Sequence, residues 1–137
     1  RHGVLFTIGG HPNPVAFGSA YGISQSANVA LVTVGAGTKI VVTRCSVGVD
    51  KDVTATAVAM TIGFGAANTP DVTTASGVSG VVLTHPGIAT GSGMTVGDGA
   101  GILAVGADGE DLRITHEAVT GGLGGLRVNV TYYTIES

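Results

Sequence analysis

The stretch Thr-Ala-Val-Ala-Met-Thr-Ile-Gly-Phe-Gly, residues 56–65, decides the fold class of this chain. Val58, Met60, Ile62 and Phe64 occupy every second position, and small or polar residues stand between them. Side chains of a β-strand alternate between two faces, so a period of two predicts a strand with one buried face. Residues 28–137 nowhere sustain a helical period, and the stretch therefore predicts a β fold.

The same alternation recurs on both sides of this strand. In residues 39–49 the odd-numbered face is predicted to be buried, and in residues 126–135 Leu126, Val128, Val130 and Tyr132 face one way. Further strand candidates, separated by turn residues, are 28–34, 78–84 (ended by a turn at His85-Pro86-Gly87), 102–105 and 111–117. Six to eight such strands predict an all-β, antiparallel two-sheet sandwich, and the jelly roll is the commonest variety.

Residues 1–27 differ from the rest and are predicted to form an N-terminal arm or linker, with the sandwich domain at residues 28–137. The run Gly-Gly-His-Pro-Asn-Pro at residues 9–14 breaks any long strand, because proline fixes the backbone and removes a hydrogen-bond donor. Apolar patches on either side would be poorly hidden in water, so we expect the arm to lie against another surface, such as that of another subunit. The predicted contact residues are Val4, Leu5, Phe6, Pro12, Pro14, Phe17 and Tyr21.

Composition excludes several classes of function. Of 137 residues 24 are Gly and only 11% are charged, which favours strands and turns over helices. The net charge is −3 and the six cations are scattered, so no basic field is present and we expect no nucleic-acid partner. No apolar run approaches the length of a membrane span, so we expect no membrane partner. A single cysteine excludes an internal disulfide and fits assembly in a reducing cytoplasm.

Residues that could carry chemistry are few and do not group. The run Gly-Gly-Leu-Gly-Gly at residues 121–125 precedes a strand and has no nearby Lys, so it predicts a hairpin turn and not a phosphate loop. The four histidines show no metal-ligand spacing, and His116 is expected to be a half-buried strand residue. Cys45 lies mid-strand on an apolar face and is expected to be an inert thiol. We therefore predict no enzyme: no catalytic residues, no cofactor and no metal.

Five segments together resemble a phage structural family. They are residues 35–43 (Gly-Ala-Gly-Thr-Lys-Ile-Val-Val-Thr), the small-residue strand 56–65, Pro86-Gly87-Ile88, residues 106–114 (Gly-Ala-Asp-Gly-Glu-Asp-Leu-Arg-Ile) and residues 125–132 (Gly-Leu-Arg-Val-Asn-Val-Thr-Tyr). The likeness, over residues 28–137, is to small jelly-roll proteins of tailed phages and gene transfer agents, of the head-decoration, spike-base and fibre-knob type. It implies a non-enzymatic virion protein, usually a trimer or other symmetric oligomer, with an arm that grips the capsid or a neighbouring subunit.

The function expected from these observations is that of a virion structural protein. As a capsid decoration or spike-base protein it would bind the major capsid protein or neighbouring virion subunits at the virion surface, as a homo-oligomer with a trimer favoured, after assembly in the host cytoplasm. The alternative is a receptor- or carbohydrate-binding knob that reads a host glycan through loops 66–77 and 88–101, with Tyr133, Asn68 and Asp71 as candidate contacts. Residues 40–42 and 81–83 are apolar on both faces, which fits either a subunit contact or a central strand.

Overall fold

The computed structural model describes residues 16–22, 27–53, 56–65, 78–117, 119 and 125–137. These residues form strands and contain no helix. The strands are β1 (Ala16–Gly22), β2 (Ala27–Val32), β3 (Thr38–Val49), β4 (Ala57–Gly65), β5 (Val78–Ala89), β6 (Gly93–Val96), β7 (Ala104–Val105), β8 (Leu112–His116) and β9 (Leu126–Glu136).

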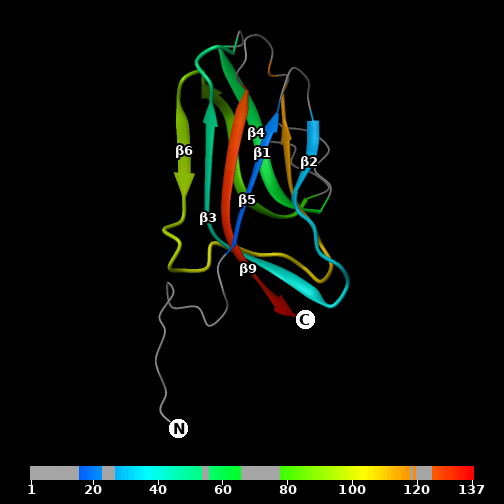
Figure 1. Ribbon diagram of the computed structural model, residues 1–137. Coiled ribbons are helices and arrows are strands. Elements are labelled where there is room, and N and C mark those ends of the chain that lie inside the picture. The colour runs from blue at the N-terminus through cyan, green and yellow to red at the C-terminus, as the bar shows by residue number, and fades with distance from the viewer. Residues whose placement is uncertain (1–15, 23–26, 54–55, 66–77, 118, 120–124) are drawn as a thin grey trace.

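Two antiparallel sheets face each other, which confirms the predicted all-β sandwich (Figure 1). One sheet has the order β1-β9-β3-β6, with β7 also paired to β3, and the other has the order β2-β8-β4-β5. The pairs β1·β9, β2·β8, β3·β6 and β4·β5 are nested, as in one long hairpin rolled into two layers. This nesting supports the jelly-roll variety expected from the strand count.

Part of the predicted arm lies inside the sandwich. Ala16–Gly22 forms β1 and pairs with β9 along its whole length, from Ala16↔Tyr132 to Gly22↔Leu126. An arm that ends at residue 27 would therefore include a strand of the first sheet. Residues 1–15 lie outside the described residues.

The core lies between the sheets, and β4 contributes to it as predicted. Val58, Met60, Ile62 and Phe64 are all fully buried. Opposite and beside them, the buried cluster takes Ile40, Val42, Cys45, Val47 and Val49 from β3, Leu112 and Ile114 from β8, and Leu126, Val128 and Val130 from β9. Burial raises the pKa of the Cys45 thiol to about 12, so the thiolate is disfavoured.

The face of β3 that reaches the core changes at a β-bulge. The register with β9 shifts between Val42 and Arg44, which leaves Thr43 as an extra residue whose hydroxyl donates to the Thr131 carbonyl at 3.1 Å. Even-numbered side chains therefore face the core before the bulge and odd-numbered ones after it. The odd-numbered positions are buried as predicted, Val41 included, but Val41 is not part of the core cluster, and Ile40 and Val42, which were assigned to the other face, are part of it.

Strand β5 continues through Pro86, where a turn was predicted. The strand runs to Ala89, and its register with β4 shifts between Val58 and Met60, opposite this point. Because β5 is the last strand of its sheet, proline can be accommodated there without breaking an inner ladder. The Gly87 N–H donates to Nδ1 of His85 at 3.0 Å, so the predicted turn is instead an irregularity in an edge strand.

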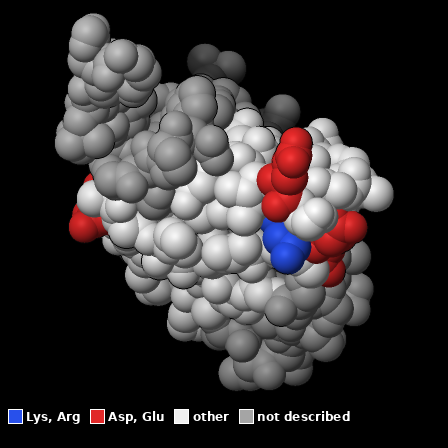
Figure 2. All heavy atoms as spheres, turned by 90° about the horizontal axis from the view of Figure 1, so that it is seen from below, with Lys and Arg blue, Asp and Glu red and all other residues white. Residues whose placement is uncertain are grey.

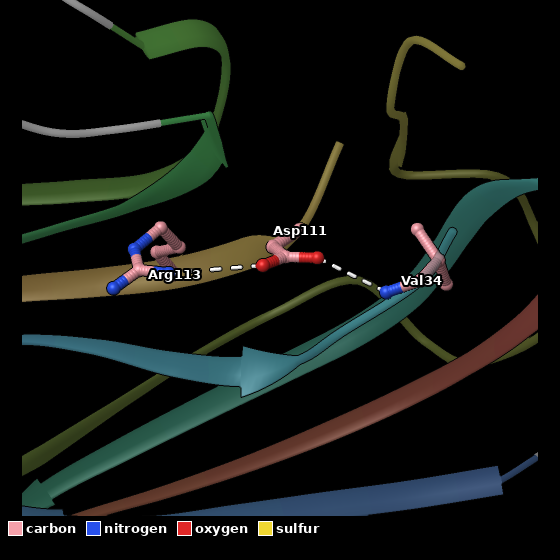
Figure 3. Close-up of polar contacts among 3 residues, drawn as sticks. All are labelled: Val34, Asp111 and Arg113. Carbon is pink, nitrogen blue, oxygen red and sulfur yellow. Dashed lines mark hydrogen bonds and ion pairs between the residues drawn. The ribbon is translucent and has the colours of Figure 1, made fainter. Parts of the chain in front are cut away.

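Two aspartates of the segment 106–114 tie neighbouring turns together. Asp111 Oδ1 accepts the Val34 N–H at 3.0 Å just after β2, and its Oδ2 lies 3.7 Å from Arg113 (Figure 3). Asp108 Oδ1 accepts the Ser137 hydroxyl at 2.5 Å and the Gly37 N–H at 2.7 Å, and these hydrogen bonds lower the pKa of this carboxyl. The carboxylates thus fasten the turn before β8 to the end of β2, to the turn before β3 and to residue 137.

Candidate interaction surface

One edge of the sandwich carries the large apolar side chains that are exposed among residues 29–53, 56–65, 80–117, 119 and 125–137, the part of the chain whose side chains the structure describes. Val81 on β5 is 44% exposed, Met94 on β6 36%, Ile102 in the β6–β7 loop 60% and Val105 on β7 47%. β5 closes one sheet, β6 and β7 border β3 in the other, and β5 contacts both of them. We call the surface formed by β5, β6, β7 and the β6–β7 loop the open edge. Clusters of exposed apolar side chains are typical of interaction sites.

The open edge is almost free of charge. In residues 78–107 Asp98 is the one Asp, Glu, Lys or Arg. Beside this edge Arg44 of β3 is exposed, and a Cβ at Gly97 would lie 3.1 Å from the Arg44 Cα. In the view from below, charged side chains of both signs form a small group on one side, acidic atoms appear separately at the opposite side, and most of the remaining described surface is uncharged (Figure 2). A partner of the open edge would therefore be recognised by shape, apolar contact and backbone pairing, and not by charge.

Strand β6 leaves backbone groups unpaired on its outer side (Figure 1). The Val49 N–H donates to the Ser92 carbonyl at 2.9 Å. Hydrogen-bonded pairs recur at every second residue of an antiparallel ladder, so the next two are Val47 with Met94 and Cys45 with Val96. Alternate residues of an antiparallel strand point their N–H and C=O away from the partner. In β6 these are Gly93 and Thr95, whose outward groups have no partner among the described residues.

Glycine is required where this edge approaches β3. A Cβ at Gly97 would lie 2.3 Å from the Thr43 carbonyl oxygen, and Gly97 has a φ of +78°. A Cβ at Gly93 would lie 2.7 Å from the Val47 carbonyl oxygen. The glycines thus hold β6 and the following loop close against β3 and its bulge.

A shallow hollow of about 360 Å³ lies beside β6. It is lined by Thr43, Gly97, Asp98, Gly101, Ile102 and Leu103. Asp98 Oδ1 accepts the N–H groups of Ala100 at 2.8 Å and Gly101 at 3.1 Å. These bonds, led by that from Gly101, lower the pKa of the carboxyl, so Asp98 stabilises its own loop as an anion. The hollow offers no second charged group for a ligand.

The predicted contact residues fall into three groups. Val4, Leu5, Phe6, Pro12 and Pro14, together with Asn68 and Asp71, lie outside the described residues. Phe17 and Tyr21 lie on β1, at the register positions of Thr131 and Arg127 of β9. Tyr133 is 6% exposed and lies opposite Val41 of β3, so it is not the exposed receptor contact that was predicted.

His116 is more buried than predicted. It has no exposed surface, its Nδ1 lies 2.7 Å from the Glu117 carbonyl, and its Nε2 has no hydrogen-bond partner in the structure. Burial lowers the pKa of this imidazole, so it is held neutral in the core. Within the described ranges no three His, Cys, Asp or Glu side chains come together as metal ligands.

The sequence analysis did not single out the open edge. The signal that could have found it is the near absence of charge in residues 78–107, combined with the two-sided apolar run 81–83. The apolar runs 40–42 and 81–83 differ in their exposure. Val41 is buried because β3 is a central strand, whereas Val81 is exposed because β5 is an edge strand. The described part of the chain has no helix with the length and hydropathy that crossing a membrane requires.

Comparisons with known proteins return little. No family model matches the chain, and no curated protein matches it significantly. Among solved structures, a chain of the cyanophage Pam1 capsid asymmetric unit is similar, with 22% sequence identity over 95% of this chain and 93% of that chain and a TM-score of 0.37. At that TM-score the likeness carries no argument about fold or function.

Proposed function

We propose that this chain is a structural protein of a phage-like particle, a head-decoration or spike-base protein that binds the particle surface and stabilises it or presents other proteins. The observation that carries the proposal is the open edge, which gathers Val81, Met94, Ile102 and Val105 on one side of a sandwich. A small domain with such a surface is suited to association. The motif resemblance of residues 28–137 to phage decoration and spike-base proteins is the reason for proposing a phage-like particle as the partner.

The arrangement suits a role as a non-catalytic building block. Asp108 and Asp111 fasten the turns at one end, and the hollow beside β6 is shallow and carries one carboxylate that is engaged by its own loop. In a symmetric oligomer, several weak contacts to a particle act together and reach a high combined affinity without a deep pocket. We propose that the open edge serves subunit association and that residues 1–15 contact the particle.

The receptor-binding alternative has no comparable support. Of its candidate contacts, Tyr133 is buried, and Asn68 and Asp71 lie outside the described residues. Among the residues whose side-chain exposure the structure describes, no aromatic side chain is exposed that could stack on a sugar ring.

The test is antibody-gold labelling of particles from the source culture, viewed by electron microscopy. Label spread over the heads is expected. Gold confined to tail tips, or on no particle, would contradict the decoration role and move the receptor-binding reading to first place.

A truncation then tests the arm. It must stop at residue 15, because β1 begins at Ala16 and pairs with β9. Deletion of residues 1–15 is expected to abolish binding to particles and to leave the far-UV circular dichroism of the β domain unchanged. A matched pair, Phe6→Ser against Thr7→Ser, separates loss of an apolar contact from a general effect of substitution in the arm. Full binding by the truncated chain would refute the role of the arm.

A further inference from the structure

We infer that strand β6 pairs antiparallel with β6 of a second copy of this chain, about a two-fold axis that passes through Met94. The exposed edge of β6 has the features that strand pairing requires. Gly93 and Thr95 direct unpaired N–H and C=O groups outward, and β6 contains no Lys, Arg or Pro of the kind that blocks edge association in natural sheets. The inference rests on the open edge and not on the proposed role in a virion.

The strand is self-complementary in one register. If Gly93 faces Thr95 of the second copy and Thr95 faces its Gly93, both pairs occupy hydrogen-bonded positions and exchange four backbone bonds. Met94 then lies opposite Met94 of the second copy at a non-hydrogen-bonded position, where Cα atoms are about 4.5 Å apart. Gly93 brings no side chain to the contact, and the pairing closes as a dimer because a two-fold contact uses the same surface on both copies.

The charge distribution favours a second copy as the partner. Each chain carries a net charge of −3, but residues 78–107 contain one charged side chain, Asp98. Two open edges can therefore meet with little repulsion. Met94, which is 36% exposed, lies at the centre of the contact and would lose exposed apolar surface on pairing.

A cysteine at the proposed axis tests the register directly. The Met94→Cys variant of the 137-residue chain is expected to form a disulfide-linked dimer under mild oxidation, because the Cα separation suits a disulfide. The natural Cys45 is buried with a raised pKa and does not compete. The matched control is Ala107→Cys, which lies exposed in the turn after β7 and is expected to stay monomeric on a non-reducing gel. Equal cross-linking of both variants, or none at Met94→Cys, would overturn the register.

Proline at the outward position tests the pairing itself. Thr95→Pro removes an N–H that points away from β3, so the inner ladder keeps its bonds. By light scattering coupled to size exclusion, we expect the mass of a dimer for the natural chain and for Thr95→Ser, and at least a tenfold weaker dimer for Thr95→Pro, all with the same circular dichroism. A natural chain that is monomeric at about 100 µM, or any oligomer, a trimer included, that Thr95→Pro leaves unchanged, refutes the inference. Heads labelled by antibody in that case would leave the proposed function standing.

Discussion

Replacing Asp111 with alanine should destabilise the sandwich by about 2 kcal/mol. The substitution leaves the Val34 N–H, now bonded at 3.0 Å, without its acceptor, and a lost hydrogen bond to a charged group is worth about 1.5–3 kcal/mol. The ion pair to Arg113 at 3.7 Å joins two partly exposed side chains and adds only about 0.2–1 kcal/mol. Because the Asp111 and Arg113 side chains are both partly exposed, we expect a loss in the lower half of the sum of these two ranges.

Urea unfolding followed by circular dichroism measures this loss, and two variants divide it. Asp111→Asn keeps an acceptor oxygen for the Val34 N–H and removes the charge, so it should lose about 0.5–1 kcal/mol. Arg113→Gln removes the ion pair and leaves the Asp111 carboxylate bonded to the Val34 N–H, so it should lose less than Asp111→Ala, about 0.5–1 kcal/mol. The reasoning is refuted if Asp111→Ala unfolds at the same urea concentration as Arg113→Gln, since the backbone bond would then contribute nothing.

Two further predictions concern the core. Gly106→Ala places a Cβ 2.7 Å from Phe64 Cδ1 and should destabilise the chain by about 1–3 kcal/mol, whereas Gly101→Ala meets no atom within 4 Å and should be nearly neutral; thermal unfolding compares the two. The neutral His116 should make the chain less stable as the pH is lowered. Its pKa is lower in the folded chain, so below about pH 6.5 the unfolded chain binds more protons than the folded chain. The free energy of unfolding therefore decreases as the pH falls from about 6.5 to the folded pKa, and levels off below it. In His116→Asn, urea midpoints between pH 7 and 5 should show a smaller drop, and an equal drop would exclude His116 as its cause.

Local alternation predicted the strands well where the sheet is regular. The pattern Val58, Met60, Ile62, Phe64 needs only the pleat of a strand to place all four side chains in the core, and the structure buries all four. The face of β3 could not be predicted in the same way. Its bulge at Thr43 depends on a hydrogen bond to Thr131, and the sequence does not say which residues lie beside Thr43.

The features missed by the sequence analysis all depend on neighbours in the sheet. β1 combines Phe17 and Tyr21 with Ala, Gly and Ser residues and becomes a strand beside β9, which local propensity does not reveal. Pro86 is compatible with a strand because β5 is at an edge. The open edge exists because β6 and β5 are terminal in their sheets, and sheet order is a property of topology that no local window contains.

The nested pairing has a consequence for biosynthesis. β1 pairs with β9, so the first described strand can join its sheet only after the last described strand is present. Contacts between distant parts of a chain slow folding, and on the ribosome this pair cannot form until β9 has left the exit tunnel. The outer position in the first sheet, next to β9, is thus completed only after β9 has been synthesised. A translation product that stops before β9 lacks the partner of β1.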